Sequence, residues 1–268
     1  MNLVIFVKIG GFLVSDITWP LSEVVTNGRE ANKEASVGRA VKILGKDKVC
    51  EAADVAKVWD KKLRDGHGQI GYSVELLGEC AAENATGIAD WRLTYHLGQN
   101  LEEMYIIRGD DKKRQPCFLP AIRRKDGKKS EGSEWFPNLH ILHPLNTTGF
   151  ESWDGRMAER KAEYWLTNFN PLYSEMKWEE QEKLIRSVPF QIRTDIAVFC
   201  ETLMSIFMLK GARLFKNHLH WTNSKYRGYY LAAGRFIPYG LFIKECWPGH
   251  WGLAVSVSKK HDIVSASK

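Results

Sequence analysis

The sequence predicts an α+β protein with an antiparallel, strand-rich N-terminal half, a three-helix insertion over about 153–211 and a terminal set of strands. Three observations lead to this prediction. Short β-rich runs separated by glycine and charged turns fill residues 69–142. Longer segments with helical spacing of apolar residues follow them, and aromatic, strand-like runs return after Arg213. We therefore expect two regions, a strand-rich one over 1–150 and a helical-then-stranded one over 151–268.

The N-terminal elements follow from the spacing of apolar side chains. Residues 2–8 read as a short buried strand, and the apolar spacing within 33–44 and 51–64 predicts two amphipathic helices. Period-two and β-branched character then favours a series of strands. These expected strands are 70–77, 91–97, 104–108, 117–124 and 136–142.

The pattern changes after residue 153. Helical spacing covers 158–169 and 173–187, and a long apolar helix is expected after Pro189 with Gly211 as its C-cap. Strand-like runs close the chain. These are 214–221, 229–232, 241–245 and 252–258.

Composition excludes several classes of protein. The chain has 268 residues, 44% of them hydrophobic and 26% charged, which is untypical of collagen-like, low-complexity or wholly disordered chains. The apolar run at residues 3–7 is too short for a signal peptide, and the most apolar later stretch, 192–209, carries three charges. The five cysteines are widely spaced and form no CxxC pair. We therefore expect reduced thiols, a cytoplasmic location and no membrane partner.

Positive charge is concentrated in two regions. The formal net charge is +6, but residues 108–129 alone hold nine basic and three acidic side chains. Residues 186–268 hold twelve basic and four acidic side chains. Clustered Lys and Arg that neutralise phosphates release condensed counterions, so this distribution predicts contact with a polyanion.

Aromatic side chains accompany the second basic region. Residues 213–251 contain ten aromatic and six basic residues, a combination that can stack unpaired bases while cations hold the backbone. We expect Lys216, Lys225 and Arg227 to contact phosphates there, with Trp221 and Tyr229 as stacking platforms. A hairpin in the first basic region is expected to clamp a further stretch of phosphates. Its candidate residues are Lys112, Lys113, Arg114, Arg123, Arg124, Lys128 and Lys129.

The sequence His218-Leu219-His220 is the main candidate for catalysis. Residues i and i+2 of a strand share a face, so both imidazoles would project together, as two metal ligands must. The pair resembles the His-hydrophobic-His motif of rolling-circle nucleases, in which a downstream tyrosine attacks the phosphate. Here Tyr226, Tyr229 and Tyr230 follow the pair. The resemblance implies a divalent metal and catalytic roles for His218 and His220.

Three further patterns predict a metal site or a nuclease site. Cys246 and His250 could add ligands to the histidine pair and form a structural zinc site. Arg213 and His218 have the spacing of the Arg-x4-His motif of HEPN ribonucleases, which acts on a helix. Asp154 with Glu159-Arg160-Lys161 resembles the Asp…Glu-x-Lys set of metal-dependent nucleases. No Gly-rich phosphate loop, GxSxG elbow or HExxH motif occurs, so the sequence gives no support to other hydrolase classes.

Taken together, these patterns favour a nucleic-acid-binding protein. We expect a non-catalytic subunit of a nucleoprotein complex that contacts RNA or DNA, works with other protein subunits and needs no cofactor. One alternative is a metal-dependent nuclease built on His218 and His220. Another is a structural, self-assembling protein whose basic segments meet an acidic surface, such as 131–185, of a neighbouring copy.

Overall fold

The computed structural model describes most of the chain outside residues 105–159. The four N-terminal strands form two small antiparallel sheets, β1 with β4 and β2 with β3. They are β1 (Asn2–Val4), β2 (Val7–Ile9), β3 (Phe12–Val14) and β4 (Thr18–Pro20). The remaining described residues are 34–63, 67–104, 160–215, 218–226, 228–237, 240–247, 249 and 253–262.

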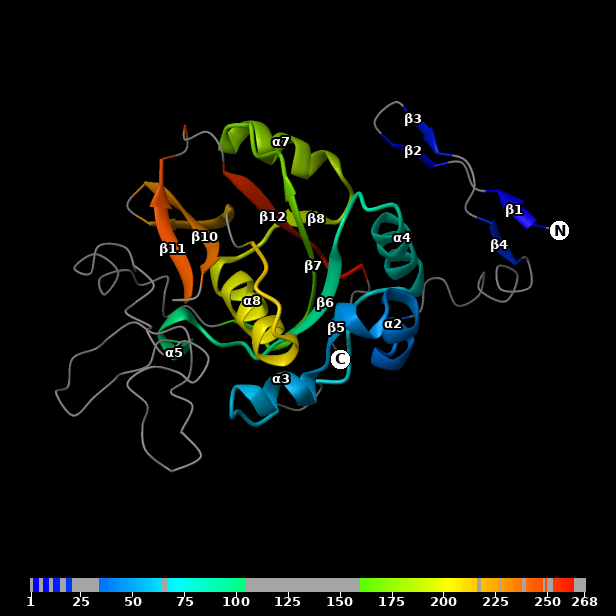
Figure 1. The fold of residues 1–268 in the computed structure, drawn as a ribbon, viewed down its shortest axis with the longest axis horizontal. Helices are drawn as coiled ribbons and strands as arrows, with labels where there is room; N and C mark the ends of the chain where they lie inside the picture. The colour runs from blue at the N-terminus through cyan, green and yellow to red at the C-terminus, as the bar shows by residue number, and fades with distance from the viewer. Residues whose placement is uncertain are drawn as a thin grey trace, which may run out of the picture.

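One mixed sheet of eight strands forms the centre of this part of the chain (Figure 1). Seven strands follow the order β11-β10-β9-β12-β7-β6-β5, and β8 also pairs with β12. Most neighbours are antiparallel, but β12 runs parallel to β9 and β5 parallel to β6. The strands are β5 (Val49–Cys50), β6 (Trp91–His96), β7 (Glu163–Leu172), β8 (Gln191–Arg193), β9 (Leu219–Tyr226), β10 (Tyr229–Ile237), β11 (Gly240–Cys246) and β12 (Ala254–Lys259).

The helices begin at residues whose side chains cap them. Ser36, Ser73 and Asp195 each accept hydrogen bonds from backbone N–H groups of the first helical turn, which have no partner within the helix. The described helices are α2 (Val37–Leu44), the 3-10 helix η1 (Lys46–Lys48), α3 (Ala52–Val58), α4 (Val74–Ala85), α5 (Leu101–Met104), α7 (Trp178–Ser187) and α8 (Ile196–Lys210).

Helix α8 is the central helix of the fold. Thirteen consecutive residues, from Ile196 to Met208, are buried, so the helix is enclosed on all sides. It ends at Gly211, which adopts the left-handed conformation at φ 67° that favours glycine at a C-cap. This long helix and its cap confirm the sequence-based expectation.

The α+β class is also confirmed, but several elements were predicted wrongly. The expected strand 214–221 begins only at Leu219, and residues 191–193, expected in the long helix, form β8. Residues 163–169, expected at the end of a helix over 158–169, belong to β7 (Glu163–Leu172), because pairing with β6 and β12 on its two sides outweighs local helical spacing. The expected strand 70–77 instead leads into α4, whose buried side chains Leu76, Leu77 and Cys80 have helical spacing. The expected three-helix insertion therefore contains two helices, α7 and α8, together with β7 and β8. The expected strands at 117–124 and 136–142, and all but Met104 of the one at 104–108, lie outside the described residues.

The sheet crosses the boundary expected near residue 150. Strand β6 comes from the first region and pairs with β7 of the second along six residues, from Trp91↔Asn168 to His96↔Glu163. A single large hydrophobic cluster contains residues from both regions, including Leu93 and Phe199. The described parts of the two regions therefore share one core.

A fully buried His–Glu contact joins β6 to α8. His96 Nδ1 accepts the N–H of Gly98 at 2.9 Å, so the ring proton lies on Nε2, which faces Glu201 Oε2 at 2.8 Å. The other carboxylate oxygen of Glu201 accepts the N–H of Leu97 at 2.7 Å. Glu201 thus fixes the end of β6 against the middle of α8.

We predict that Glu201→Ala destabilises the protein by roughly 2–5 kcal/mol, because it leaves the buried N–H of Leu97 without its acceptor and removes the carboxylate that faces the buried His96 Nε2. Thr202→Val is the matched control on the same helix, since the Thr202 hydroxyl is buried without a hydrogen-bond partner. This control should be neutral or stabilising. Urea unfolding of both variants tests the prediction, and equal stabilities would contradict it.

Candidate nucleic-acid interface

The tip of the β9–β10 hairpin carries exposed residues of the aromatic C-terminal region, among them Lys225, Gly228 and Tyr229. Tyr226 pairs with Tyr229, so only two residues connect the strands, and Gly228 has the positive φ of 81° that such a turn requires. The next pair, Lys225 with Tyr230, points to the opposite face, because side chains alternate along a strand. The tip therefore presents different side chains on its two faces.

The first face carries a stack of rings and cations. The rings of Trp178 and Tyr230 are nearly parallel, with centroids 3.9 Å apart. Lys225 is exposed, and its ammonium lies 4.6 Å from the Tyr230 centroid and 5.9 Å from that of Trp178. Lys225 is therefore held at the shared edge of the two rings by cation–π attraction.

Arg193 supports this stack from inside the protein. Its guanidinium lies 4.4 Å from the Trp178 ring centroid and donates hydrogen bonds to Gln181, Glu182 and the Trp178 carbonyl. Burial lowers the pKa of Arg193 to about 10, an effect that Glu182 opposes. Arg193 is thus charged at neutral pH and fully engaged, so it anchors the stack and is not a free contact for a ligand.

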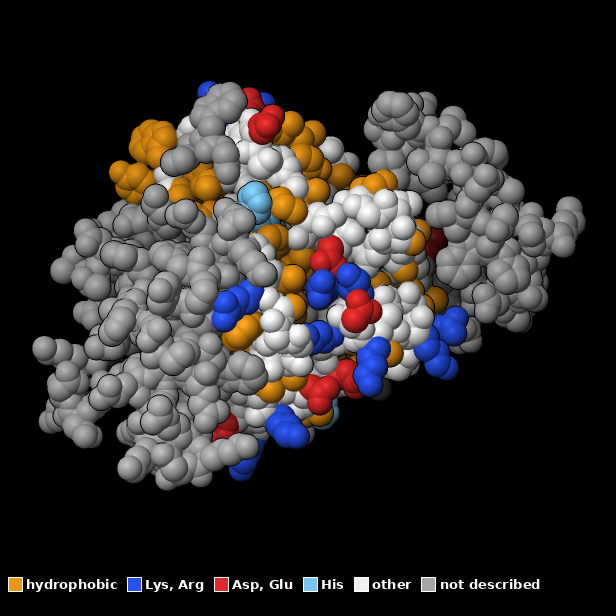
Figure 2. All heavy atoms as spheres, viewed as in Figure 1, with side chains coloured by type: hydrophobic (Ala, Val, Ile, Leu, Met, Phe, Trp, Pro, Cys, Tyr) orange, Lys and Arg blue, Asp and Glu red, His pale blue; other side chains and the backbone are white. Residues whose placement is uncertain are grey.

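The second face carries an exposed aromatic pair. The rings of Tyr229 and Trp247 meet edge to face, with centroids 5.9 Å apart and an interplanar angle of 65°. Trp247 is 64% exposed and Tyr229 38% exposed. Figure 2 shows hydrophobic side chains gathered on the surface in the part of the molecule where β10 and β11 lie. We call Tyr229 and Trp247 the aromatic pair below.

The aromatic pair lies at the end of a sheet face that is otherwise core. Leu231 and Ala233, which follow Tyr229 at two-residue spacing on β10, are fully buried in the main hydrophobic cluster. Helix α8 starts at Ile196, whose N–H donates to Ser224 Oγ on β9. Towards the hairpin tip the strands extend past this helix end, and Tyr229 is left exposed there.

The structure separates the predicted binding residues into three groups. Lys225 and Tyr229 are exposed at the hairpin tip, on opposite faces. Trp221 is fully buried, with its ring edge to face with that of Tyr230 at 6.1 Å, so its predicted role as a stacking platform is corrected. The other predicted residues lie outside the described parts of the chain. These are Lys112, Lys113, Arg114, Arg123, Arg124, Lys128, Lys129, Lys216 and Arg227.

The predicted histidine pair is not assembled as a metal site. His218 precedes β9 and is exposed, whereas His220 is fully buried, with its ring centroid 3.7 Å from that of Phe215. No cluster of three or more His, Cys, Asp or Glu side chains suited to a metal occurs among the described residues. The catalytic role expected for His220 is therefore corrected, because a side chain sealed in the core cannot reach a substrate.

Of the weaker catalytic patterns, the structure contradicts the HEPN-like one and leaves the other two untested. Residues 211–213 precede a turn and 219–226 form a strand, so Arg213 and His218 do not share the helix that the HEPN motif needs. Cys246 is buried, while His250, Asp154 and Glu159 lie outside the described residues. The His96–Glu201 contact resembles a catalytic dyad, but both side chains are fully buried and His96 Nδ1 already accepts the Gly98 N–H, so no substrate can reach the pair.

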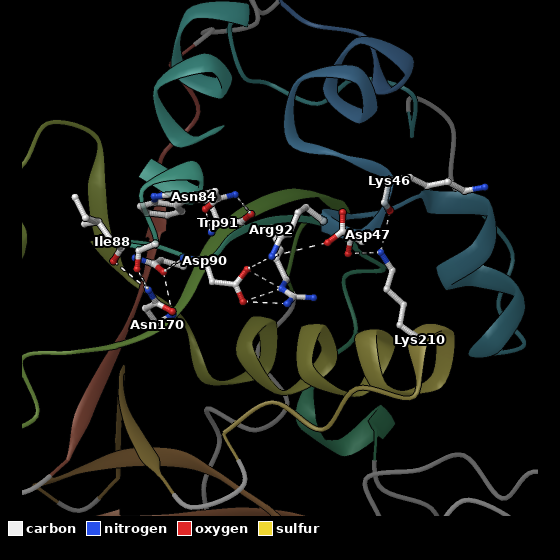
Figure 3. Close-up of polar contacts among 12 residues, drawn as sticks. Lys46, Asp47, Asn84, Ile88, Asp90, Trp91, Arg92, Asn170 and Lys210 are labelled. Atoms are coloured by element: carbon white, nitrogen blue, oxygen red, sulfur yellow. Dashed lines mark hydrogen bonds and ion pairs between the residues drawn. The ribbon is translucent and has the colours of Figure 1, made fainter. Parts of the chain in front are cut away.

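Three basic side chains on another part of the surface, Lys48, Arg92 and Lys210, are paired with acceptors of the protein itself (Figure 3). Lys48 and Arg92 both pair with Asp90, at 2.8 Å and 3.0 Å. Burial raises the pKa of Asp90, but hydrogen bonds from Arg92 and Lys48 outweigh this effect and lower it overall. Lys210, the last residue of α8, donates hydrogen bonds to the backbone carbonyls of Lys46, Asp47 and Val49. These cations stabilise the fold and offer little to a polyanion.

Comparison with known proteins leaves the classification at the level of the fold, an α+β protein with one mixed sheet. The sequence and structure match no family model, no curated protein and no solved structure. Within the described residues, no helix has the length and apolar character needed to cross a bilayer. The four described cysteines, Cys50, Cys80, Cys200 and Cys246, are buried and form no disulfide with one another.

Sequence reasoning did not select two residues that shape the hairpin tip. Trp247 stands directly before Pro248-Gly249, and a turn dipeptide at a strand end is a signal for exposure. Trp178 carried no comparable signal, because its stacking on Tyr230 joins residues 52 positions apart in the sequence. Only the packing of α7 against the sheet brings the two rings together.

The buried state of His220 predicts a pH dependence. Desolvation lowers its pKa from 6.5 to about 3, and the charge of His218 adds to the decrease. The unfolded chain therefore binds one more proton than the folded chain between pH 6.5 and 3, and the folded state loses stability as the pH falls through this range. The slope from this residue is at most roughly 1.4 kcal/mol per pH unit.

His220→Phe should flatten this dependence, since phenylalanine keeps the aromatic contacts with Phe215 and Phe199 but does not titrate. The measurement is the free energy of unfolding in urea at pH 7 and pH 4.5. Thr202→Val, which removes a buried hydroxyl and no titratable group, is the control and should keep the wild-type slope. If His220→Phe also keeps that slope, His220 is not the residue responsible.

Proposed function

We propose that this chain binds nucleic acid as a non-catalytic subunit of a nucleoprotein complex. The observation that supports this most directly is the hairpin tip. There the exposed Lys225 and Tyr229 flank the same two-residue turn, and the exposed Trp247 contacts Tyr229. Aromatic rings stack on bases and cations attract phosphates, and proteins that bind nucleic acid combine the two in this way. A tip formed by a two-residue turn also projects from the sheet, so a long polymer can approach it.

Charge supports the same function. The chain carries a formal net charge of +6 and a sequence pI near 9.0, which favours association with polyanions. Several other described cations are already paired, as Lys48, Arg92 and Lys210 illustrate. The exposed Lys225 and the basic region at 108–129 are therefore the expected phosphate contacts.

A non-catalytic role agrees with the chemistry of the described residues. His220 and His96 are both fully buried. The described residues of the hairpin tip offer rings and a cation for binding, and neither of these two histidines can reach a bound phosphate to transfer a proton.

The salt dependence of binding tests this proposal. We expect the association constant for a fluorescein-labelled oligonucleotide to fall steeply between 50 and 300 mM NaCl, because each phosphate contact releases counterions. Lys225→Gln should reduce the slope of log K against log salt by roughly 0.7 to 0.9, the contribution of about one contact. Fluorescence anisotropy gives both quantities.

Lys42→Gln is the matched control. Lys42 is an exposed lysine on α2, so this variant loses the same charge at a position outside the hairpin tip. It should keep the wild-type slope. Binding that is insensitive to salt, or an equal reduction of the slope by both variants, would argue against the hairpin tip as a phosphate contact.

A further inference from the structure

We propose that the hairpin tip takes single-stranded nucleic acid, with unpaired bases stacking on the aromatic pair and the neighbouring phosphates lying against Lys225. This inference rests on the proposed function, because it specifies which form of nucleic acid the site takes. It concerns Trp247 as well as Tyr229, and it assigns Trp247 as the main stacking platform.

The exposure of the rings favours unpaired bases. In a duplex, each base is covered above and below by its neighbours, so a protein meets base edges and phosphates. A flat indole makes its largest contact with the face of a base, which is accessible only in a single strand or a flipped nucleotide. Trp247 is the most exposed of the large hydrophobic side chains described in the structure, at 64%, and offers such a contact surface.

The indole of Trp247 is held in place before any ligand arrives. A side-chain carbon built on Gly249 would lie only 3.0 Å from Nε1 and 3.1 Å from Cδ1 of Trp247, so the ring edge packs directly on the glycine backbone. Tyr229 contacts the ring from another side. Because the ring is already ordered, binding costs less side-chain entropy than with a freely rotating tryptophan.

The arrangement of charge fits a thin, flexible ligand. Lys225 lies on the opposite face of the two-stranded tip, held along Tyr230. A single strand can bend around this tip and contact both faces, whereas a duplex is stiff over this length. Asp195, an acid at the base of the hairpin, accepts a hydrogen bond from Ser224 and forms a two-point ion pair with Arg160. Its charge is therefore compensated and does not repel the strand.

The test compares one single strand with one duplex. The probes are a fluorescein-labelled 20-nucleotide poly(dT) strand and a blunt 20-base-pair dA·dT duplex, measured by anisotropy at the same salt concentration. We expect tighter binding of the single strand. Trp247→Ala should weaken it by roughly 5- to 100-fold, the range for loss of one stacked base, and leave duplex binding unchanged. Tyr229→Ala should have a smaller effect in the same direction.

Two control variants exclude simpler explanations. Trp247→Phe keeps an aromatic face and should retain most of the single-strand affinity. Phe190→Ala removes another exposed aromatic ring, 52% exposed before β8, and should not change binding. Thermal unfolding of each variant checks the fold, and the exposure of both positions predicts little change.

Each outcome separates this inference from the proposed function. A preference for the duplex, equal losses on both probes, or wild-type affinity in Trp247→Ala would overturn the single-strand inference while leaving nucleic-acid binding in place. Absence of salt-dependent binding to either probe would overturn the proposed function itself.

Discussion

The insertion of β12 into the middle of the sheet is the constraint on which the rest of the structure depends. This strand lies between β9 and β7, and it also pairs with β8. Val255 and Val257 on β12 are fully buried, so the last strand of the described chain contributes to the main core. Removing it would separate the aromatic hairpin from the strands β7, β6 and β5. The position of the hairpin tip thus depends on the pairing of Ala254 and Val255 with His220 and Trp221, which lie 34 positions earlier in the chain.

Helix α8 fixes the other side of the hairpin. Asp195 caps the helix and also receives a hydrogen bond from Ser224 on β9, and Ser224 in turn accepts the first N–H of the helix. In the middle of the helix, Glu201 holds the end of β6. The same helix therefore positions both halves of the sheet. Polar groups do this with defined geometry, because a buried donor or acceptor without its partner costs free energy.

The two faces of the hairpin tip differ in exposure because different helices lie beside them. One face packs against α7, where Trp178 stacks on Tyr230, and Arg193 of β8 lies over the Trp178 ring, while Lys225 at the edge of the stack is open to solvent. The other face extends beyond the helix that covers the core, so Tyr229 and Trp247 stay exposed. Neighbouring aromatic residues of the same strand thus become core or surface residues according to whether a helix covers their side of the sheet.

The sequence by itself determined the α+β class, helix α8 with its glycine cap, helices α2 and α3, and the strands β6 and β10–β12 in outline. These follow from local spacing and capping residues, which act within a few positions of the chain. It also determined that Lys225 and Tyr229 belong to an aromatic, basic segment. Only the tertiary structure decided that residues 163–172 form a central strand, that β9 runs over Leu219–Tyr226 and not over 214–221, that Trp221 and His220 are buried, and that Trp247 is exposed. Those outcomes depend on strand pairing and burial between distant residues, and such long-range contacts leave no periodic signal in a single sequence.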